Sequence, residues 1–68
     1  MDADERIDFA QREATEAGLT SAIEVADVQA FLLGATLTHF DETPTVPMTD
    51  ARWRRIVRAG IAHVRDDS

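Results

Sequence analysis

Residues 21–40, SAIEVADVQAFLLGATLTHF, are the most apolar stretch of the chain, and their spacing decides the fold. On a helical wheel, at about 100° per residue, the apolar side chains form two neighbouring rows. The first row contains Ile23, Ala26, Ala30, Leu33, Leu37 and Phe40. The second row contains Val25, Val28, Leu32 and Ala35 and ends at His39. Because a helix that is apolar over most of its circumference must be covered on more than one side, we expect a central helix that is buried on two sides.

The sequence also marks where this helix begins and ends. Ser21 and Glu24 have the spacing of a capping box, in which the side chain of each residue accepts a hydrogen bond from the backbone N–H of the other. Pro44 and Pro47 push the residues before them out of the helical region. The helix should therefore stop at about residue 41, where a Pro-containing linker begins.

Two further helices are predicted on either side of this segment. The first covers about residues 4–17 and is followed by Gly18, a residue type that ends many helices. Its apolar stripe is narrow and mostly small, and consists of Ile7, Ala10, Ala14 and Ala17. The third covers about residues 50–65 and has the cleanest amphipathic pattern of the chain, formed by Trp53, Ile56, Val57, Gly60, Ile61 and Val64. Gly60 lies on the apolar side, where we expect it to allow close approach of another helix.

The predicted fold is all-α: a compact three-helix bundle, a single helical domain over residues 1–68, with the Pro-containing linker between the second and third helices. In this arrangement the first and third helices pack against the central one. A chain of 68 residues buries only about 60% of the surface that its unfolded form exposes. No Cys is present, so a disulfide cannot add support. We therefore expect support from self-association or from a protein partner, and a cost of about 2–5 kcal/mol when Leu33 or Ile56 is changed to Ala.

Charge is unevenly distributed along the chain. Thirteen acidic residues and seven Arg give a net charge of −6, and no Lys is present. This balance argues against a protein that coats nucleic acid through its whole surface. Five of the seven Arg lie in residues 51–68, and four of them, Arg54, Arg55, Arg58 and Arg65, form a basic face on the third helix.

Four interpretations of these charges are open. The basic face could contact an acidic protein, or it could pair with the acidic first helix or with a second subunit. Alternatively, it could place the third helix on nucleic acid, although the net charge and the long linker disfavour this. The acidic side chains of the first helix could also imitate a phosphate backbone and block a nucleic-acid enzyme; they are Asp2, Asp4, Glu5, Asp8, Glu13 and Glu16.

Two aromatic residues do not fit the apolar rows. Phe9 falls among charged residues of the first helix, and Phe31 interrupts the polar strip of the central helix. Aromatic residues are enriched at binding hot spots. We therefore predict that both belong to a partner-binding surface, together with Val28 and Leu32.

No catalytic signature is visible. Cys is absent, and the hydroxyl residues have no evident His and carboxylate beside them. The groups around His39 to Glu42, and His63 with Asp66 and Asp67, offer metal-ligand types without a framework of three or four convergent donors. We expect no enzymatic activity, no cofactor, no metal and no small-molecule substrate.

The acidic start of the chain lacks the basic and apolar regions of a secretory signal. Residues 30–37, the most apolar run, are far shorter than the roughly 20 residues that cross a bilayer, so we expect a cytoplasmic protein. The predicted function is that of a small, self-associating interaction module, which acts as a regulatory or accessory subunit or as an inhibitor. The predicted contact residues are Phe9, Phe31, Val28, Leu32, Arg54, Arg55, Arg58 and Arg65.

Overall fold

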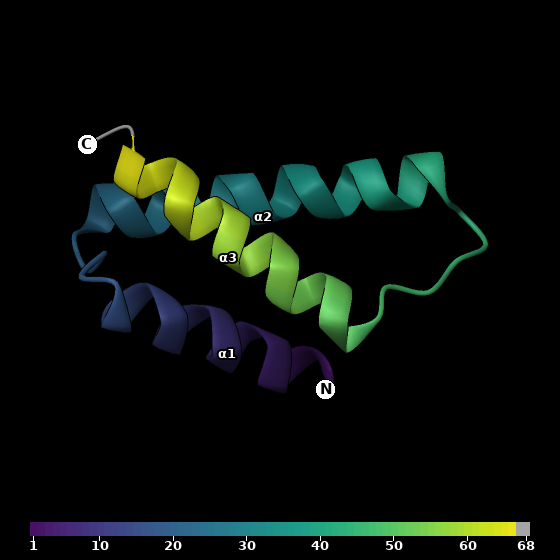
Figure 1. The fold of residues 1–68 in the computed structure, drawn as a ribbon, viewed down its shortest axis with the longest axis horizontal. Helices are drawn as coiled ribbons and strands as arrows, with labels where there is room; N and C mark the ends of the chain where they lie inside the picture. Colours follow the sequence, from purple (N-terminus) through teal and green to yellow (C-terminus); the bar gives the residue numbers. More distant parts are fainter. Residues whose placement is uncertain (67–68) are drawn as a thin grey trace.

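The computed structural model describes residues 1–66, which form three α-helices (Figure 1). They are α1, Ala3–Glu16, α2, Ala22–Glu42, and α3, Asp50–Asp66. The predicted all-α architecture of three compactly packed helices is confirmed, and each helix lies within two residues of its expected bounds.

Each helix begins at a residue whose side chain caps its first turn. Asp2 accepts a hydrogen bond from the N–H of Glu5 at 2.8 Å, and Ser21 accepts one from Glu24 at 3.1 Å. Both pairs form complete capping boxes. Thr49 accepts a hydrogen bond from the N–H of Arg52 at 3.1 Å and so caps α3. These local bonds fix the helix boundaries independently of the packing between helices.

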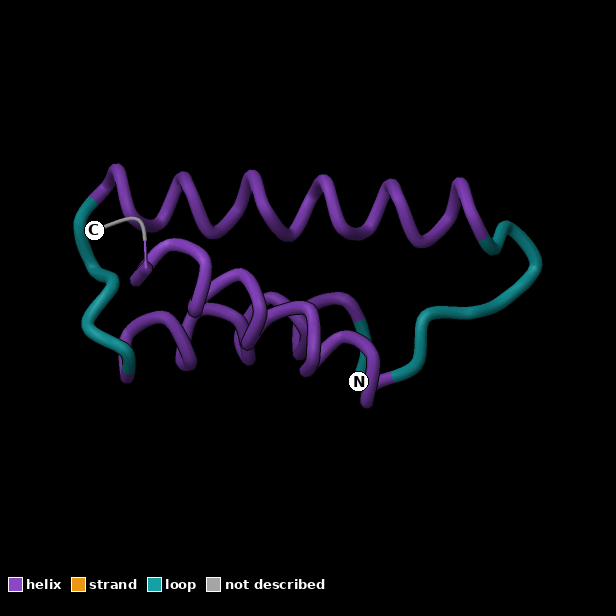
Figure 2. The backbone as a smooth tube through the Cα atoms, turned by 45° about the horizontal axis from the view of Figure 1, so that its top comes forward, coloured by secondary structure: helices purple, strands orange, loops and turns teal. Residues whose placement is uncertain are grey.

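The α3 helix occupies the central position in the bundle. It packs against both α1 and α2, while α1 and α2 approach each other closely at few points. Figure 1 shows α3 crossing obliquely in front of the space between the other two helices. Figure 2 shows α2 running on one side of the pair that α1 and α3 form. The expectation that α2 is the central helix, covered by both neighbours, is therefore wrong.

The physical reason lies in the different widths of the apolar faces of α1 and α3. The stripe on α1 is short and consists of small residues, of which Ala10 and Ala14 are buried. The clean amphipathic face of α3 is wide enough to receive α1 on one side and α2 on the other, and its Val57 is fully buried. Only one helix is then left to cover α2.

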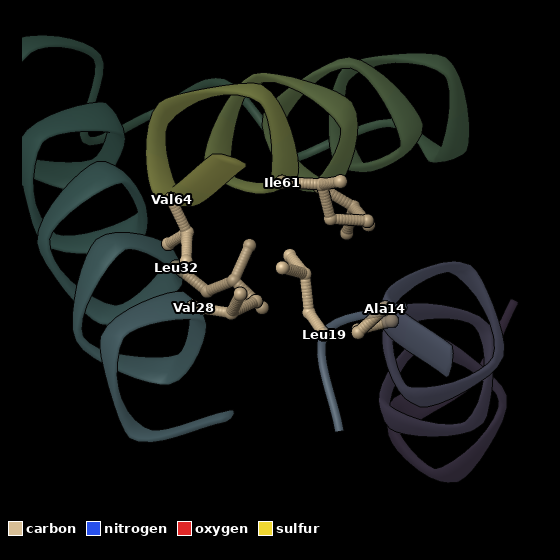
Figure 3. Close-up of a cluster of buried hydrophobic side chains, with 8 residues drawn as sticks. Ala14, Leu19, Val28, Leu32, Ile61 and Val64 are labelled. Carbon is tan, nitrogen blue, oxygen red and sulfur yellow. The ribbon is translucent and has the colours of Figure 1, made fainter. Parts of the chain in front are cut away.

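The core is thin and is formed where side chains from the three helices and the first loop meet (Figure 3). Leu19, just after Gly18, folds back into it; its N–H donates to the carbonyl of Ala14 at 2.9 Å. Gly18 makes this turn with a φ of 81°, in the left-handed region that favours glycine. The buried members of the core are Ala10, Ala14, Leu19, Val28, Leu32, Val57, Ile61 and Val64.

The linker between α2 and α3 is attached to the bundle at two points. Met48 is buried, and its carbonyl accepts a hydrogen bond from the guanidinium of Arg6 at 2.7 Å. His39, which is also buried, places its Nε2 atom 3.1 Å from the carbonyl oxygen of Val46. Because a carbonyl oxygen only accepts, Nε2 of His39 must carry the hydrogen of this bond.

Candidate interaction surfaces

The most apolar exposed surface is the outward side of α2. It consists of the first row predicted from the sequence, called here the outer row: Ile23, Ala26, Ala30, Leu33, Leu37 and Phe40. The four large side chains are 76%, 61%, 61% and 48% exposed in chain order. The six residues of the outer row follow one another at steps of 3, 4, 3, 4 and 3 residues, which are those of the a and d positions of a coiled coil. The row therefore forms a continuous seam, in contrast to the scattered exposed residues that any protein has.

The second row of α2 faces α3 and fills the core. Val28 is 4% exposed, Leu32 is 9% exposed, and His39 lies at the same side of the helix. Val28 and Leu32 were expected on the surface left for a partner, and that expected exposure is wrong. The opposite error concerns Leu33, which was expected in the core and is largely exposed.

Both misfit phenylalanines are half-buried and pack inside the chain. Phe9 packs against the core cluster. Phe31 packs against α3. Its ring lies over Gly60, and the centre of the ring is 5.4 Å from the centre of the His63 ring. The expected close approach of a helix at Gly60 is confirmed, and Phe31 is the side chain that makes it. Phe9 and Phe31, which were predicted to contact a partner, are thus largely used to pack α1 and α2 onto the rest of the bundle.

An apolar groove lies between α1 and α2, with a volume of about 530 Å³. Ile7 and Ala14 line one wall, Val25 lines the other, and Leu19 and Trp53 also border it. None of its lining residues is charged, and the polar ones, such as Gln29, are neutral. The groove exists because α1 and α2 both rest on α3 without closing on each other.

A charged cluster joins the beginnings of α1 and α3. The amino group of Met1 lies 2.6 Å from Asp50 Oδ2, and Arg6 Nη2 lies 3.4 Å from Asp50 Oδ1. The indole of Trp53 donates to the carbonyl of Arg6 at 3.1 Å, with the guanidinium 6.0 Å from its ring centre. The hydrogen bond from the Met1 amino group, together with both positive charges, lowers the pKa of Asp50 against an opposing effect of desolvation. This cluster holds the two helix ends together.

The basic face of α3 is divided between two surroundings. Arg58 and Arg65 line a shallow hollow together with Glu13 and Glu16 of α1. Arg54 and Arg55 are exposed. Some acidic residues at the start of α1 are engaged locally: Asp2, its N-cap, and Glu5 form the capping box. On the same helix Asp8 pairs with Arg12 at 3.0 Å. The capping box and the Asp8–Arg12 pair thus account for three of the acidic side chains, and Arg58 and Arg65 lie beside carboxylates of α1.

Neither a metal cluster nor a membrane-spanning helix is found in the part of the chain that the structure describes. Within residues 1–66, no three His, Asp or Glu side chains come together as a metal site would require. Asp67, considered above beside His63 and Asp66, lies outside the described residues. No helix among the described residues has the length and apolar character needed to cross a membrane.

Comparison of this chain with protein-family models, with curated proteins and with solved structures found no match.

Proposed function

We propose that this chain is a small, non-catalytic protein–protein interaction module of the cytoplasm, which serves as an accessory or regulatory subunit and docks through the outer row of α2. The observation that carries the proposal is the exposure of this row: six exposed apolar residues at coiled-coil spacing follow one another along α2. Burying such a seam against a second helix is the usual way in which this pattern is stabilised.

The size of the exposed surface supports the same interpretation. The chain exposes 4691 Å², whereas a monomer of 7.5 kDa is expected to expose roughly 4,200 Å². Its principal extents of 35 × 22 × 16 Å describe an elongated particle, along which α2 forms one edge. The outer row runs from Ile23 to Phe40, about 25 Å along the helix at 1.5 Å per residue. Apolar surface that is contiguous over such a length marks an interaction site more often than scattered residues do.

Docking of nucleic acid on α3 and imitation of nucleic acid by α1 have weaker support. Arg58 and Arg65 share their hollow with two carboxylates, which would repel a phosphate. Three of the six acids considered for mimicry, Asp2, Glu5 and Asp8, are already used in the capping box and in a pair with Arg12. A protein that docks on the outer row of α2 would meet no like charge and would displace no ion pair, because no charged residue interrupts this row.

Site-specific photo-crosslinking in the source cell tests the proposal. A photoreactive phenylalanine analogue replaces Leu33 in one variant, and Ala59, an exposed residue of α3, in the control. We expect a discrete covalent adduct from position 33 alone, and we expect it to disappear when Leu37→Glu is added. Adducts of equal yield from both positions, or adducts that persist with Leu37→Glu, would contradict docking through the outer row.

A further inference from the structure

We infer that the partner of the outer row is a second copy of this chain, whose α2 packs antiparallel on the first to form a dimer with twofold symmetry. This inference rests on the proposed function, since it names the occupant of the same surface. Its basis is the order in which small and large side chains follow one another along the row, together with the charges at the two ends of α2.

After Ile23, the outer row contains two small residues followed by three large ones. Its amino-terminal half contains Ala26 and Ala30, and its carboxyl-terminal half contains Leu33, Leu37 and Phe40. A row of this kind is complementary to itself only when it is reversed. If Ala30 faces Leu33 of the second copy, the same antiparallel register places Ala26 opposite Leu37 and Ile23 opposite Phe40.

This register gives the central layers of the seam the same two residue types, and each end layer combines Ile23 with Phe40. The layers formed by Ala30 with Leu33 and by Ala26 with Leu37 each combine one Ala with one Leu. This alternation of small and large residues fills a helix interface without voids. A parallel pair would instead place Ala26 against Ala26 and Phe40 against Phe40. The first of these layers would leave a void and the second would be overfilled, and both faults destabilise packing.

The charges at the ends of α2 favour the same orientation. In the antiparallel register, Asp41 of one copy, which flanks the outer row, lies beside the amino-terminal turn of the other α2, which begins at Ala22 and carries Glu24 on a different face. Carboxylates are stabilised there by the positive end of the helix dipole. A parallel pair would bring the two copies of Asp41 and Glu42 together, and like charges at that distance repel. Between Asp27 and Asp41, α2 carries no charged residue, so the seam itself has no charge to desolvate.

Both copies carry a net charge of −6, and this determines how salt should act. An apolar seam between two acidic molecules is opposed by their mutual repulsion, which salt screens. The dimer should therefore tighten as NaCl is raised from about 0.05 M to about 0.5 M. An interface formed instead by the Arg face of α3 and the acids of α1 would weaken over the same range.

Analytical ultracentrifugation over about 1–300 µM protein measures the association. We expect a concentration-dependent dimer that is lost in Leu33→Glu and retained in Ala59→Glu, its control for the added charge. We further expect Ala26→Leu and Leu37→Ala each to raise the dissociation constant by about tenfold or more, which corresponds to about 1.4 kcal/mol. Combining them restores one small and one large residue in each antiparallel layer, and the double variant should recover most of the affinity. These positions are exposed in the monomer, so circular dichroism should remain that of the wild type.

The orientation has its own measurement, because the chain has no natural Cys. A mixture of Ala30→Cys and Leu33→Cys proteins should oxidise to the mixed disulfide in preference to either homodimer. Preference for the Ala30→Cys homodimer would indicate a parallel pair and would overturn the inference, as would a dimer insensitive to Leu33→Glu.

The failure of the inference and the failure of the proposed function give different results. A monomer at about 300 µM whose photo-crosslink from position 33 contains another protein overturns self-pairing and leaves the proposed function in place. A monomer that yields no adduct from position 33 overturns both.

Discussion

The ring of Phe31 occupies the space that a side chain at Gly60 would need. Its Cδ1 atom lies 2.8 Å, and its Cγ atom 3.3 Å, from the position of a Cβ atom built on Gly60. Since Cγ belongs to the base of the ring, rotation about the last bond does not clear the space. The absence of a side chain at Gly60 thus sets how closely α2 approaches α3.

Gly60→Ala should destabilise the protein, although Ala is favoured over Gly in a helix by about 1 kcal/mol. Displacing the Phe31 ring costs about 1–3 kcal/mol, so we expect a net loss of about 1 kcal/mol in the free energy of unfolding, measured by urea titration. Gly34→Ala is the matched control, because nothing lies within 4 Å of its Cβ position; it should stabilise the protein by about 0.5–1 kcal/mol. In a Phe31→Ala background, Gly60→Ala should no longer destabilise. Equal effects of the two glycine substitutions would contradict this account.

The neighbouring residues Leu32 and Leu33 should respond very differently to the same substitution. Leu32 is 9% exposed and Leu33 is 61% exposed. We expect Leu32→Ala to cost about 2–5 kcal/mol and Leu33→Ala less than about 0.5 kcal/mol, in thermal unfolding at low micromolar protein. A large loss for Leu33→Ala under these conditions would mean that the outer row is buried within the single chain.

Asp50 should make the stability depend on pH. Its pKa is lowered in the folded protein, so its contribution is fully present above its ordinary pKa of about 3.9 and is lost as the pH falls through the lower folded value. The melting temperature of the wild type should therefore exceed that of Asp50→Asn at pH 6, and the two should converge as the solution is acidified to about pH 2. Asp27→Asn, at an exposed position of α2, controls for the change in net charge. A difference between wild type and Asp50→Asn that is the same at both pH values would contradict this prediction.

Trp53 offers a test of which surface a partner occupies. It is the only Trp of the chain, it borders the groove between α1 and α2, and its N–H is bound to the carbonyl of Arg6. The outer row lies on the other side of α2 from the core that Trp53 joins. We expect its fluorescence spectrum to stay unchanged as protein concentration increases through the dimer transition. A shift of the emission maximum that follows association would instead place the partner in the groove.

The sequence was sufficient to locate the helices because their signals are local. The capping box at Ser21, the Gly18 turn and the proline-bearing linker act within a few residues, and each was found where it was predicted. The role of Gly60 could also be predicted, since the apolar pattern of α3 continues beyond it.

The sequence could not decide which side of α2 is buried. Both apolar rows have steps of 3 and 4 residues, so each fits a helix interface equally well. The choice depends on where α1 packs, and α1 lies on α3 instead of on α2. Val28 and Leu32 were misplaced for this reason. The 3 and 4 residue steps of the outer row were visible in the sequence, but the exposure of its side chains in the structure identified it as the exposed seam.

The Phe residues were misplaced for a different reason. A helical wheel gives the direction of the Cβ atom, but a phenyl ring reaches several ångströms to either side of that direction. Phe31 starts beside the polar strip and extends over Gly60 of the next helix, which only the structure can reveal. Long side chains at the border of an apolar face are thus the positions where the wheel is least informative.

The central position of α3 has a consequence for co-translational folding on the ribosome. Synthesis proceeds from the amino terminus, so α1 and α2 emerge first, and they make few contacts with each other. Isolated helices of 14 and 21 residues are marginal in water, and cooperative folding must wait until Asp50–Asp66 has left the exit tunnel. A nascent chain arrested before α3 has emerged would expose both apolar rows of α2 to chaperones at the exit of the ribosomal tunnel.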